Sequence, residues 1–208
     1  LLDQSSEESN SENFTEHILS LNLTNSIFVD CTANESIGEH YEKLLKNSIS
    51  VVTPNKKANS ANLKKYLKLQ HSAAKSNAKF LYETNVGAGL PIINTLQNLL
   101  FSGDKVHKIE AVLSGTLSYI FNSFDGSKPF DQVVLEAKEK GYTEPDPRDD
   151  LNGLDVARKL LILARETGNL LEMEDIEVEN LVPESCRQAE SSEEFFTLLK
   201  ENADYFQE

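Results

Sequence analysis

Short apolar runs alternate with stretches of helical spacing along the first 82 residues. The runs of strand type are residues 27–31, 49–53 and 78–82. The helical stretches are a short one through Phe14, Ile18 and Leu21, one opened by the capping-box spacing Ser36-x-x-Glu39 and continuing to residue 45, and one over 60–76. Residues 1–13 are rich in Ser, Glu and Asn and are predicted to form a loop. Strands that alternate with helices predict a parallel α/β layer.

The pattern changes after residue 82. A glycine-containing loop precedes a helix that begins near Pro91, and residues 106–113 have the pattern of a strand. Further helices are predicted over 116–122, 130–140, 152–166 and an amphipathic stretch at 195–206, with Gly141 and Gly168 as helix C-caps. We therefore expect an α/β domain over 1–82 and an α+β domain over 83–208.

Charge narrows the possible partners. The chain has 20 Lys+Arg against 34 Asp+Glu and a formal net charge of -14, which argues against nucleic acid or an anionic membrane surface as a partner. The acidic excess lies in the flanks, because residues 25–167 carry a net charge of only +1. No apolar run approaches the roughly 18 residues of a membrane span, and no secretory signal pattern is present, so the expected location is the cytoplasm. Cys31 and Cys186 have no metal-ligand spacing.

The helix predicted over 152–166 carries a candidate chemical pair. Asp155 and Lys159 are four residues apart, on a narrow polar stripe of a helix that is otherwise apolar on most sides. One interpretation is an ordinary surface ion pair worth a few tenths of a kcal/mol. The other is a lysine that faces a partly desolvated cleft and donates a proton, with the aspartate tuning its charge. The residue types alone leave both open.

Three further segments combine polar groups with restricted backbone. Residues 141–150 gather carboxylates and two prolines in one turn, which is either a rigid solvated loop or a site for an ammonium group or a cation. Lys56 follows a predicted strand at the edge where α/β sheets bind ligands, although a plain surface lysine is the commoner case. The glycine loop at 83–91 could present one carboxylate and backbone carbonyls to a hard cation. This loop lacks the third glycine of a dinucleotide-binding turn.

Taken in order, these segments resemble homoserine dehydrogenase. The resemblance covers roughly residues 25–170 and is closest to the dehydrogenase portion of bifunctional aspartokinase–homoserine dehydrogenases. It rests on VTPNKKAN at 52–59, ETNVGAGLP at 83–91, SGTLSYIF at 114–121, GYTEPDPRDDLNGLDVARK at 141–159 and LLILARETG at 160–168. It implies a partial Rossmann-like NAD(P)-binding layer followed by an α+β catalytic and dimerisation domain. The implied reaction interconverts L-homoserine and L-aspartate 4-semialdehyde, on the route to threonine and methionine.

The resemblance also implies roles for individual residues. Lys159 matches the catalytic lysine, and Lys56 matches a second lysine near the reacting oxygen and the cofactor. The implied substrate-binding residues are Glu144, Asp155, Asp150 and Thr116. Thr32 falls where the ribose and nicotinamide side of the cofactor is approached, and the implied monovalent cation, such as Na⁺, is bound by Glu83 and the carbonyls of Val86, Ala88 and Leu90. The implied partner is a second copy, in a homodimer or higher homo-oligomer.

One feature departs from the family pattern. The glycine-rich phosphate turn with which the family's nucleotide-binding domain begins has no counterpart in these 208 residues, and Met173 is the only methionine. We therefore expect a fragment, poorly active by itself. Two alternatives follow: a non-catalytic dimerisation piece, or a semialdehyde-handling dehydrogenase with Cys31 as its nucleophile.

Overall fold

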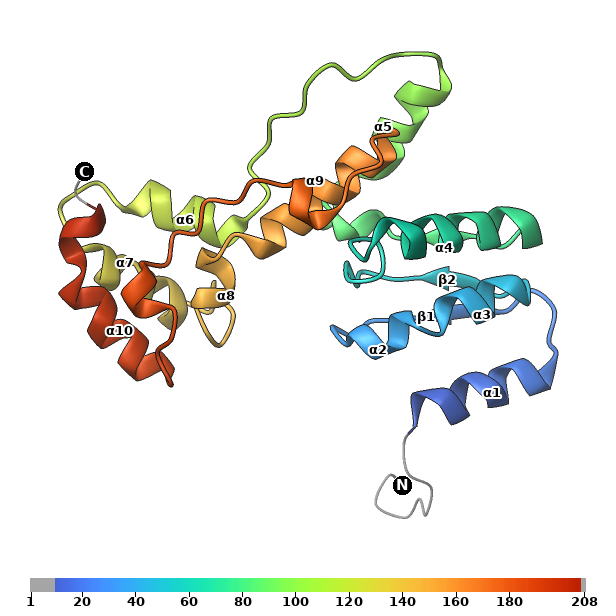
Figure 1. The fold of residues 1–208 in the computed structure, drawn as a ribbon, viewed down its shortest axis with the longest axis horizontal. Coiled ribbons are helices and arrows are strands. Elements are labelled where there is room, and N and C mark those ends of the chain that lie inside the picture. Colours follow the sequence, from blue (N-terminus) through green and yellow to red (C-terminus); the bar gives the residue numbers. More distant parts are fainter. Residues whose placement is uncertain (1–9, 207–208) are drawn as a thin grey trace. The chain divides into compact units, whose positions relative to one another are not determined.

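The computed structural model describes residues 10–206, so the first nine residues of the loop expected at 1–13 lie outside it (Figure 1). The described residues form two compact units. Unit 1 contains residues up to 105 together with 161–173, and unit 2 contains 106–160 and the residues from 174 onward. Helix α9 (Leu154–Glu166) begins in unit 2 and ends in unit 1. The domain boundary expected after residue 82 stays a prediction.

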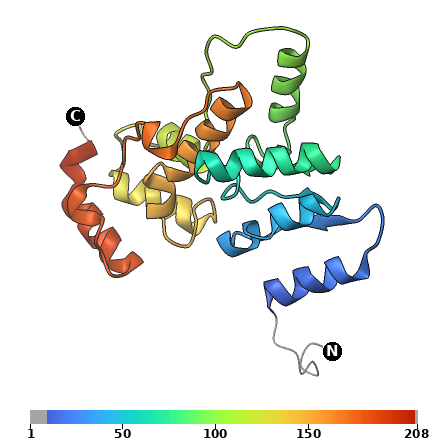
Figure 2. The same ribbon diagram turned by 45° about the vertical axis from the view of Figure 1, so that its right-hand side comes forward.

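Unit 1 is built on a parallel three-stranded sheet, which confirms the expected α/β layer. The strands are β1 (Ile27–Val29), β2 (Ser50–Val52) and β3 (Phe80–Leu81), in the order β1-β2-β3. Figures 1 and 2 show them grouped with the helices α1 (Ser11–Leu21), α2 (Glu35–Gly38), α3 (Tyr41–Lys46) and α4 (Leu63–Ser76). A short 3-10 turn, η2 (Glu83–Asn85), and helix α5 (Ile92–Phe101) follow the sheet.

The core of unit 1 lies on one face of this sheet. Phe28, Val51 and Phe80 share one row of the register, and the ring of Tyr41 packs edge-on against both phenylalanines. The core residues from α3 and α4 are Tyr41, Leu44, Leu45, Leu69 and Ala73. On the opposite face, Ile27, Val29 and Leu81 are 64%, 61% and 52% exposed.

Unit 2 is helical in its described part. Its helices are α6 (Gly115–Ser123), α7 (Phe130–Glu139), α8 (Arg148–Leu151), the start of α9 and α10 (Ser192–Glu201), with 3-10 turns η3 (Met173–Asp175), which starts at the boundary with unit 1, η4 (Glu184–Cys186) and η5 (Ala203–Phe206). Their apolar faces bury Ile120, Phe130, Val134, Leu151, Phe195 and Leu199, together with the Cys186 thiol. Within residues 10–206, no helix is long and apolar enough to cross a membrane.

Several predicted elements differ from the structure. Residues 106–113 form no strand, because a strand is stabilised by hydrogen bonds to a partner and no described strand pairs with them; Val112 is 80% exposed. The helix predicted from residue 36 is two short helices, α2 and α3, and its N-cap is Asn34, whose side chain accepts from the Ser36 amide. The glycine C-caps are confirmed, since Gly141 and Gly168 have φ of +72° and +87°.

Candidate active site

The Asp155–Lys159 pair lies on the first half of α9, within unit 2. Lys159 Nζ is 2.7 Å from Asp155 Oδ2 and donates to the Leu113 carbonyl oxygen, also at 2.7 Å. The Lys159 side chain is only 17% exposed, against 39% for Asp155. Because the Lys159 side chain is largely buried and also donates to a backbone carbonyl, this pair differs from an ordinary solvent-exposed ion pair. The helix is less covered than expected, because Leu154 and Leu160 are 44% and 38% exposed.

The acidic turn before α9 is organised by hydrogen bonds of its own. Asp150 Oδ2 accepts from the Glu144 amide at 2.8 Å, and the Thr116 hydroxyl donates to the Tyr142 carbonyl at 2.6 Å. Burial raises the pKa of Asp150, with the Asp149 and Asp155 charges adding to the rise, while the Glu144 amide and the Thr116 hydroxyl oppose it. The structure therefore brings Thr116, Glu144 and Asp150 together, with the Glu144 side chain exposed.

The base of this turn is fixed by an arginine fork. Arg148 Nε and Nη2 donate to the Asp146 carboxylate at 2.6–3.0 Å, and Arg148 Nη1 donates to the Ala189 carbonyl at 2.6 Å. The hydrogen bonds from the guanidinium lower the pKa of Asp146 despite its partial burial. The contacts of Arg148 with Asp146 and Ala189 thus stabilise the backbone conformation between Glu144 and Asp150.

A buried polar network lies at the carboxyl ends of the strands in unit 1. Asp30 is 2% exposed, and its carboxylate accepts from the Tyr41 hydroxyl, from the Thr32 amide at 2.7 Å and from Asn55 Nδ2 at 3.3 Å. Burial alone would raise the pKa of Asp30, but these hydrogen bonds outweigh it and lower the pKa. Asp30 and Tyr41 are supporting residues that the sequence pattern did not predict; the available signal was a carboxylate directly after an apolar strand.

The two unit 1 residues expected near the cofactor adjoin this network: the Thr32 amide donates to Asp30, and Lys56 follows Asn55 in the chain. Thr32 is exposed, and its hydroxyl oxygen accepts from the Asn34 amide at 3.2 Å. Lys56 is half-buried, and its carbonyl accepts from the Ser60 amide at 2.9 Å and the Ser60 hydroxyl at 3.0 Å. Both residues follow strand ends, where parallel α/β sheets bind ligands.

The Glu83 carboxylate links the start of the glycine loop to the start of helix α5. Its two carboxylate oxygens accept from the Ile93 and Asn94 amides at 2.8 and 2.9 Å, at the first turn of α5. Gly87 has a φ of +83°, in the region that favours glycine, and its carbonyl accepts from the Leu90 amide at 2.9 Å. The Leu90 carbonyl accepts from the Ile92 amide at 2.9 Å. Val86 is fully buried, whereas Ala88 and Leu90 are exposed.

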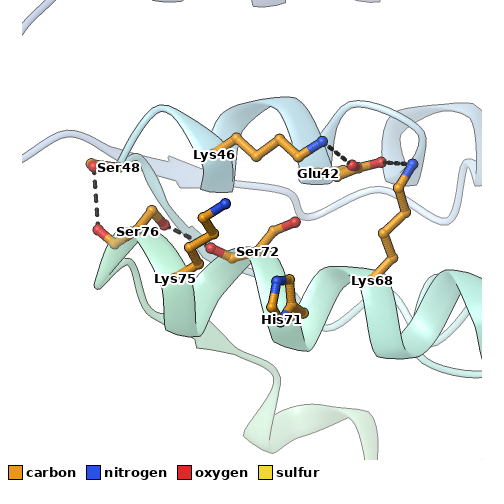
Figure 3. A pocket seen from close by; sticks show the side chains of 8 residues that line it. All are labelled: Glu42, Lys46, Ser48, Lys68, His71, Ser72, Lys75 and Ser76. Carbon is orange, nitrogen blue, oxygen red and sulfur yellow. Dashed lines mark hydrogen bonds and ion pairs between the residues drawn. The ribbon is translucent and has the colours of Figure 1, made fainter.

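A groove of about 550 Å³ between α3 and α4 contains none of the expected site residues (Figure 3). It is lined by three lysines, His71, three serines and Glu42. Glu42 pairs with Lys46 and, at 2.6 Å, with Lys68. Lys46 and Lys75 lie in the last turns of their helices, where a cation stabilises the helix dipole. These pairings and positions account for the basic lining without a ligand.

Comparison with known proteins identifies the family. The family model described as "Homoserine dehydrogenase" matches residues 91–205, and the model "Homoserine dehydrogenase, NAD binding domain" matches 1–83. The chain is 52% identical over 200 residues to the chloroplastic bifunctional aspartokinase/homoserine dehydrogenase 2 of Zea mays, covering 96% of this chain and 22% of that protein. The chain thus spans about a fifth of the length of this relative.

Two solved structures have the same fold. A Candida auris protein described as of unknown function aligns with a TM-score of 0.87 and 41% identity, covering 97% of this chain and 58% of that one. A hyperthermophilic archaeal homoserine dehydrogenase in complex with NADPH aligns with a TM-score of 0.68 and 29% identity, covering 78% and 48%. The model that matches 91–205 covers more than half of the sequence, and the chain therefore belongs to the homoserine dehydrogenase family.

Proposed function

We propose that this chain is part of an enzyme that interconverts L-homoserine and L-aspartate 4-semialdehyde with NAD(P). The observation that carries the proposal is the Lys159 ammonium, held between Asp155 Oδ2 and the Leu113 carbonyl on a helix of unit 2. Family membership supports the same reaction. Because this chain spans only part of its relatives' length, the activity is assigned to the full-length enzyme.

Lys159 is the proposed proton donor. Bound NAD(P)H supplies the hydride that reduces the aldehyde carbon. As negative charge builds on the aldehyde oxygen, an ammonium group stabilises it, and the Lys159 ammonium gives up one proton to complete the alcohol. In the reverse direction the neutral lysine takes this proton back. Asp155 orients the Lys159 ammonium through their ion pair. Lys56 is the proposed second lysine near the reacting oxygen.

The acidic turn is the proposed site for the substrate's amino end. Glu144 and Asp155 provide carboxylates for the substrate ammonium, and Asp150 and Thr116 complete the polar surroundings. The exposed Glu144 carboxylate and the Glu144 amide bound to Asp150 support this role, because the turn is held rigid while one carboxylate stays accessible. A charged partner of this kind contributes more to binding than a neutral one.

The carboxyl edge of the unit 1 sheet is the proposed contact for the nicotinamide side of the cofactor. The edge fits this group, because the exposed Thr32 hydroxyl and half-buried Lys56 follow neighbouring strands above the buried Asp30 carboxylate. The NAD-binding family model over 1–83 supports a cofactor of the NAD(P) class here. We also propose a monovalent cation such as Na⁺ at Glu83 and the carbonyls of Val86, Ala88 and Leu90. Gly87 supports it by turning this loop back.

A second copy is the proposed partner. The apolar side chains of Phe101 and Val112 are 84% and 80% exposed to solvent. A homodimer interface would remove such side chains from water. The cytoplasm stays the predicted location for a form without a targeting segment; the Zea mays relative is described as chloroplastic.

The test of the proposal is Lys159→Met in a full-length enzyme that contains this sequence. Methionine keeps most of the side-chain volume and removes the ammonium, so kcat should fall by roughly 10²–10⁴-fold in both directions while the melting temperature changes little. The matched control is Lys46→Met, which removes the same type of i,i+4 pair, with Glu42, far from the proposed chemistry in sequence. Retention by Lys159→Met of more than about a tenth of kcat contradicts the role of proton donor.

A further inference from the structure

Arg165, near the end of α9, is a buried charge that the proposed chemistry does not use. Its side chain is fully buried within unit 1. Nη1 donates to the Asn59 and Ala61 carbonyls, both at 2.8 Å, and Nε and Nη2 donate to the Leu171 carbonyl at 3.1 and 2.9 Å. Its carboxylate partner is Glu172, at 3.2 Å. Burial lowers the pKa of Arg165, and Glu172 opposes this shift.

The two carbonyls bound by Nη1 flank Ser60. Ser60 in turn donates its amide and its hydroxyl to the Lys56 carbonyl, at 2.9 and 3.0 Å. A continuous path of hydrogen bonds and one residue of backbone therefore joins the guanidinium to the backbone of Lys56. The same loop is tied on its other side by Asn59 Nδ2, which donates to Asn85 Oδ1 at 2.9 Å.

We infer that Arg165 is a positioning residue that holds the loop of residues 56–61 so that the Lys56 side chain is correctly placed for the reaction. This inference rests on the proposed function of Lys56. A buried guanidinium that binds mostly carbonyl groups is costly to desolvate, and an apolar side chain of similar size would often give an equally stable fold. Only the planar fork of arginine reaches two carbonyls on one side and a third on the other, which defines a loop geometry.

A purely structural role is the competing explanation. Glu172, the ionic partner of Arg165, also accepts from the Leu63 amide at 2.8–2.9 Å, at the start of α4. If Arg165 served only this junction, its loss would weaken folding and lower activity whatever residue stood at position 56. If Arg165 acts through Lys56, the loss of Arg165 should lower kcat only while Lys56 is present. A double-mutant cycle separates these two cases.

The experiment compares four full-length enzymes: wild type, Lys56→Met, Arg165→Met and the double variant. With saturating cofactor, Lys56→Met should lower kcat about 100-fold, and Arg165→Met about tenfold. In the Lys56→Met background, the added Arg165→Met change should lower kcat by less than about twofold. Arg165→Lys keeps the charge but loses the fork, so it should restore only part of kcat. Arg158→Met, on the same helix, is the control, with kcat expected to stay unchanged.

The outcomes are distinct. A similar loss of kcat for Arg165→Met in both backgrounds overturns the inference, and so does an unchanged kcat in the wild-type background. An unchanged kcat for Lys56→Met removes the proposed role of Lys56 itself, and with it the inference, while leaving the test of Lys159 separate. If Arg165→Met does not fold, the same cycle is run with Arg165→Lys and judged by the same two comparisons.

Discussion

At the scale of single residues, the pKa of Asp150 sets the stability of the fold against the substrate-binding role proposed for this residue. Burial raises its pKa, so the fold disfavours the charge that a substrate ammonium would need. A carboxyl whose folded pKa is raised stabilises the fold below its unfolded pKa, and this contribution is lost as the pH rises through the folded pKa. At neutral pH, the ionised Asp150 therefore costs stability that substrate binding can offset.

Asp150→Asn should accordingly stabilise the protein at pH 7 while it weakens binding. The amide oxygen can still accept from the Glu144 amide, so the free energy of unfolding should rise by a few tenths of a kcal/mol, with the gain fading below about pH 4. The KM for homoserine should rise about tenfold, because a charged hydrogen bond is lost. Chemical denaturation at pH 3.5 and 7, with steady-state kinetics, measures both. The quantity to compare is the free energy of unfolding of Asp150→Asn minus that of wild type. If this difference is smaller at pH 7 than at pH 3.5, burial does not disfavour the Asp150 charge.

The pKa of Asp30 is shifted in the opposite direction to that of Asp150. Its hydrogen bonds lower its pKa, so it contributes stability above its unfolded pKa, and this contribution is lost as the pH falls through the lower folded pKa. Tyr41→Phe removes the hydroxyl donor and should destabilise the fold by about 1–3 kcal/mol at pH 7. The stability lost on acidification should also become smaller, because the folded pKa of Asp30 moves up toward its unfolded value. Denaturation curves from pH 7 to pH 3 test this, with Tyr142→Phe, an exposed tyrosine, as the control. Equal acid sensitivity of the two variants would argue against the network.

The sequence could predict site residues whose signal is local. Lys159 and Asp155 were found by their i,i+4 spacing, and the structure shows their contact. Tyr41 and Arg165 were not found, because their partners are distant along the chain: Asp30 is 11 residues from Tyr41, and Asn59 is 106 from Arg165. A tyrosine on an amphipathic helix and an arginine at a helix end have many ordinary explanations, and only the fold selects one.

At the scale of elements, the interior of a segment was easier to predict than its ends. The strands and long helices follow from apolar periodicity, whereas the N-caps Asn34 and Asn62 replaced the expected starts at Ser36 and Ser60. Each cap is decided by one side chain that reaches a nearby backbone amide, and several neighbouring polar residues compete for that position. The strand expected over 106–113 shows a different limit, because β-structure depends on a partner that a local pattern does not contain.

The glycine loop provides a test at this scale. Gly87 has a φ of +83°, and a Cβ there would lie 2.4 Å from Ile92 Cγ1. Gly126 has the same φ, with nothing within 4 Å of an added Cβ. Gly126→Ala should therefore cost about 1–2 kcal/mol from the backbone alone, and Gly87→Ala about 1–3 kcal/mol more from the clash. Urea denaturation of both variants measures the difference. Equal losses would show that Ile92 moves aside freely and that the loop is not fixed by this contact.

At the scale of the whole molecule, the charge pattern fits the proposed cofactor better than the total charge does. A net charge of -14 would repel a dinucleotide phosphate, but residues 25–167, which contain all the expected site residues, have a net charge of +1. The acidic flanks contribute solubility and act weakly on the centre at physiological salt, where exposed charges are screened beyond about 8 Å. The net charge of -14 therefore does not argue against an anionic cofactor.

The sheet of unit 1 indicates how much of a nucleotide-binding layer this chain supplies. Parallel sheets are normally covered on both faces, yet Ile27, Val29 and Leu81 are exposed on one face of this three-stranded sheet. The residues at its carboxyl edge are the proposed polar contacts for the nicotinamide side, whereas a pyrophosphate is typically bound by a glycine-rich turn at a helix N-terminus. No such turn occurs in these 208 residues.

The 208-residue chain should therefore bind NADPH weakly when produced by itself. Loss of the pyrophosphate contacts removes several charge-assisted hydrogen bonds, and every 1.4 kcal/mol lost weakens binding tenfold, so the dissociation constant should be at least about 100-fold higher than that of a full-length enzyme containing this sequence. Calorimetric titration of both proteins with NADPH measures the ratio. Thr32→Val in the full-length enzyme is the companion measurement, and it should weaken binding only about tenfold, because it removes one neutral hydroxyl. If the short chain binds NADPH as tightly as the full-length enzyme, the strand-edge residues of unit 1 provide most of the affinity, and the phosphate turn contributes much less than the general rule for dinucleotide sites requires.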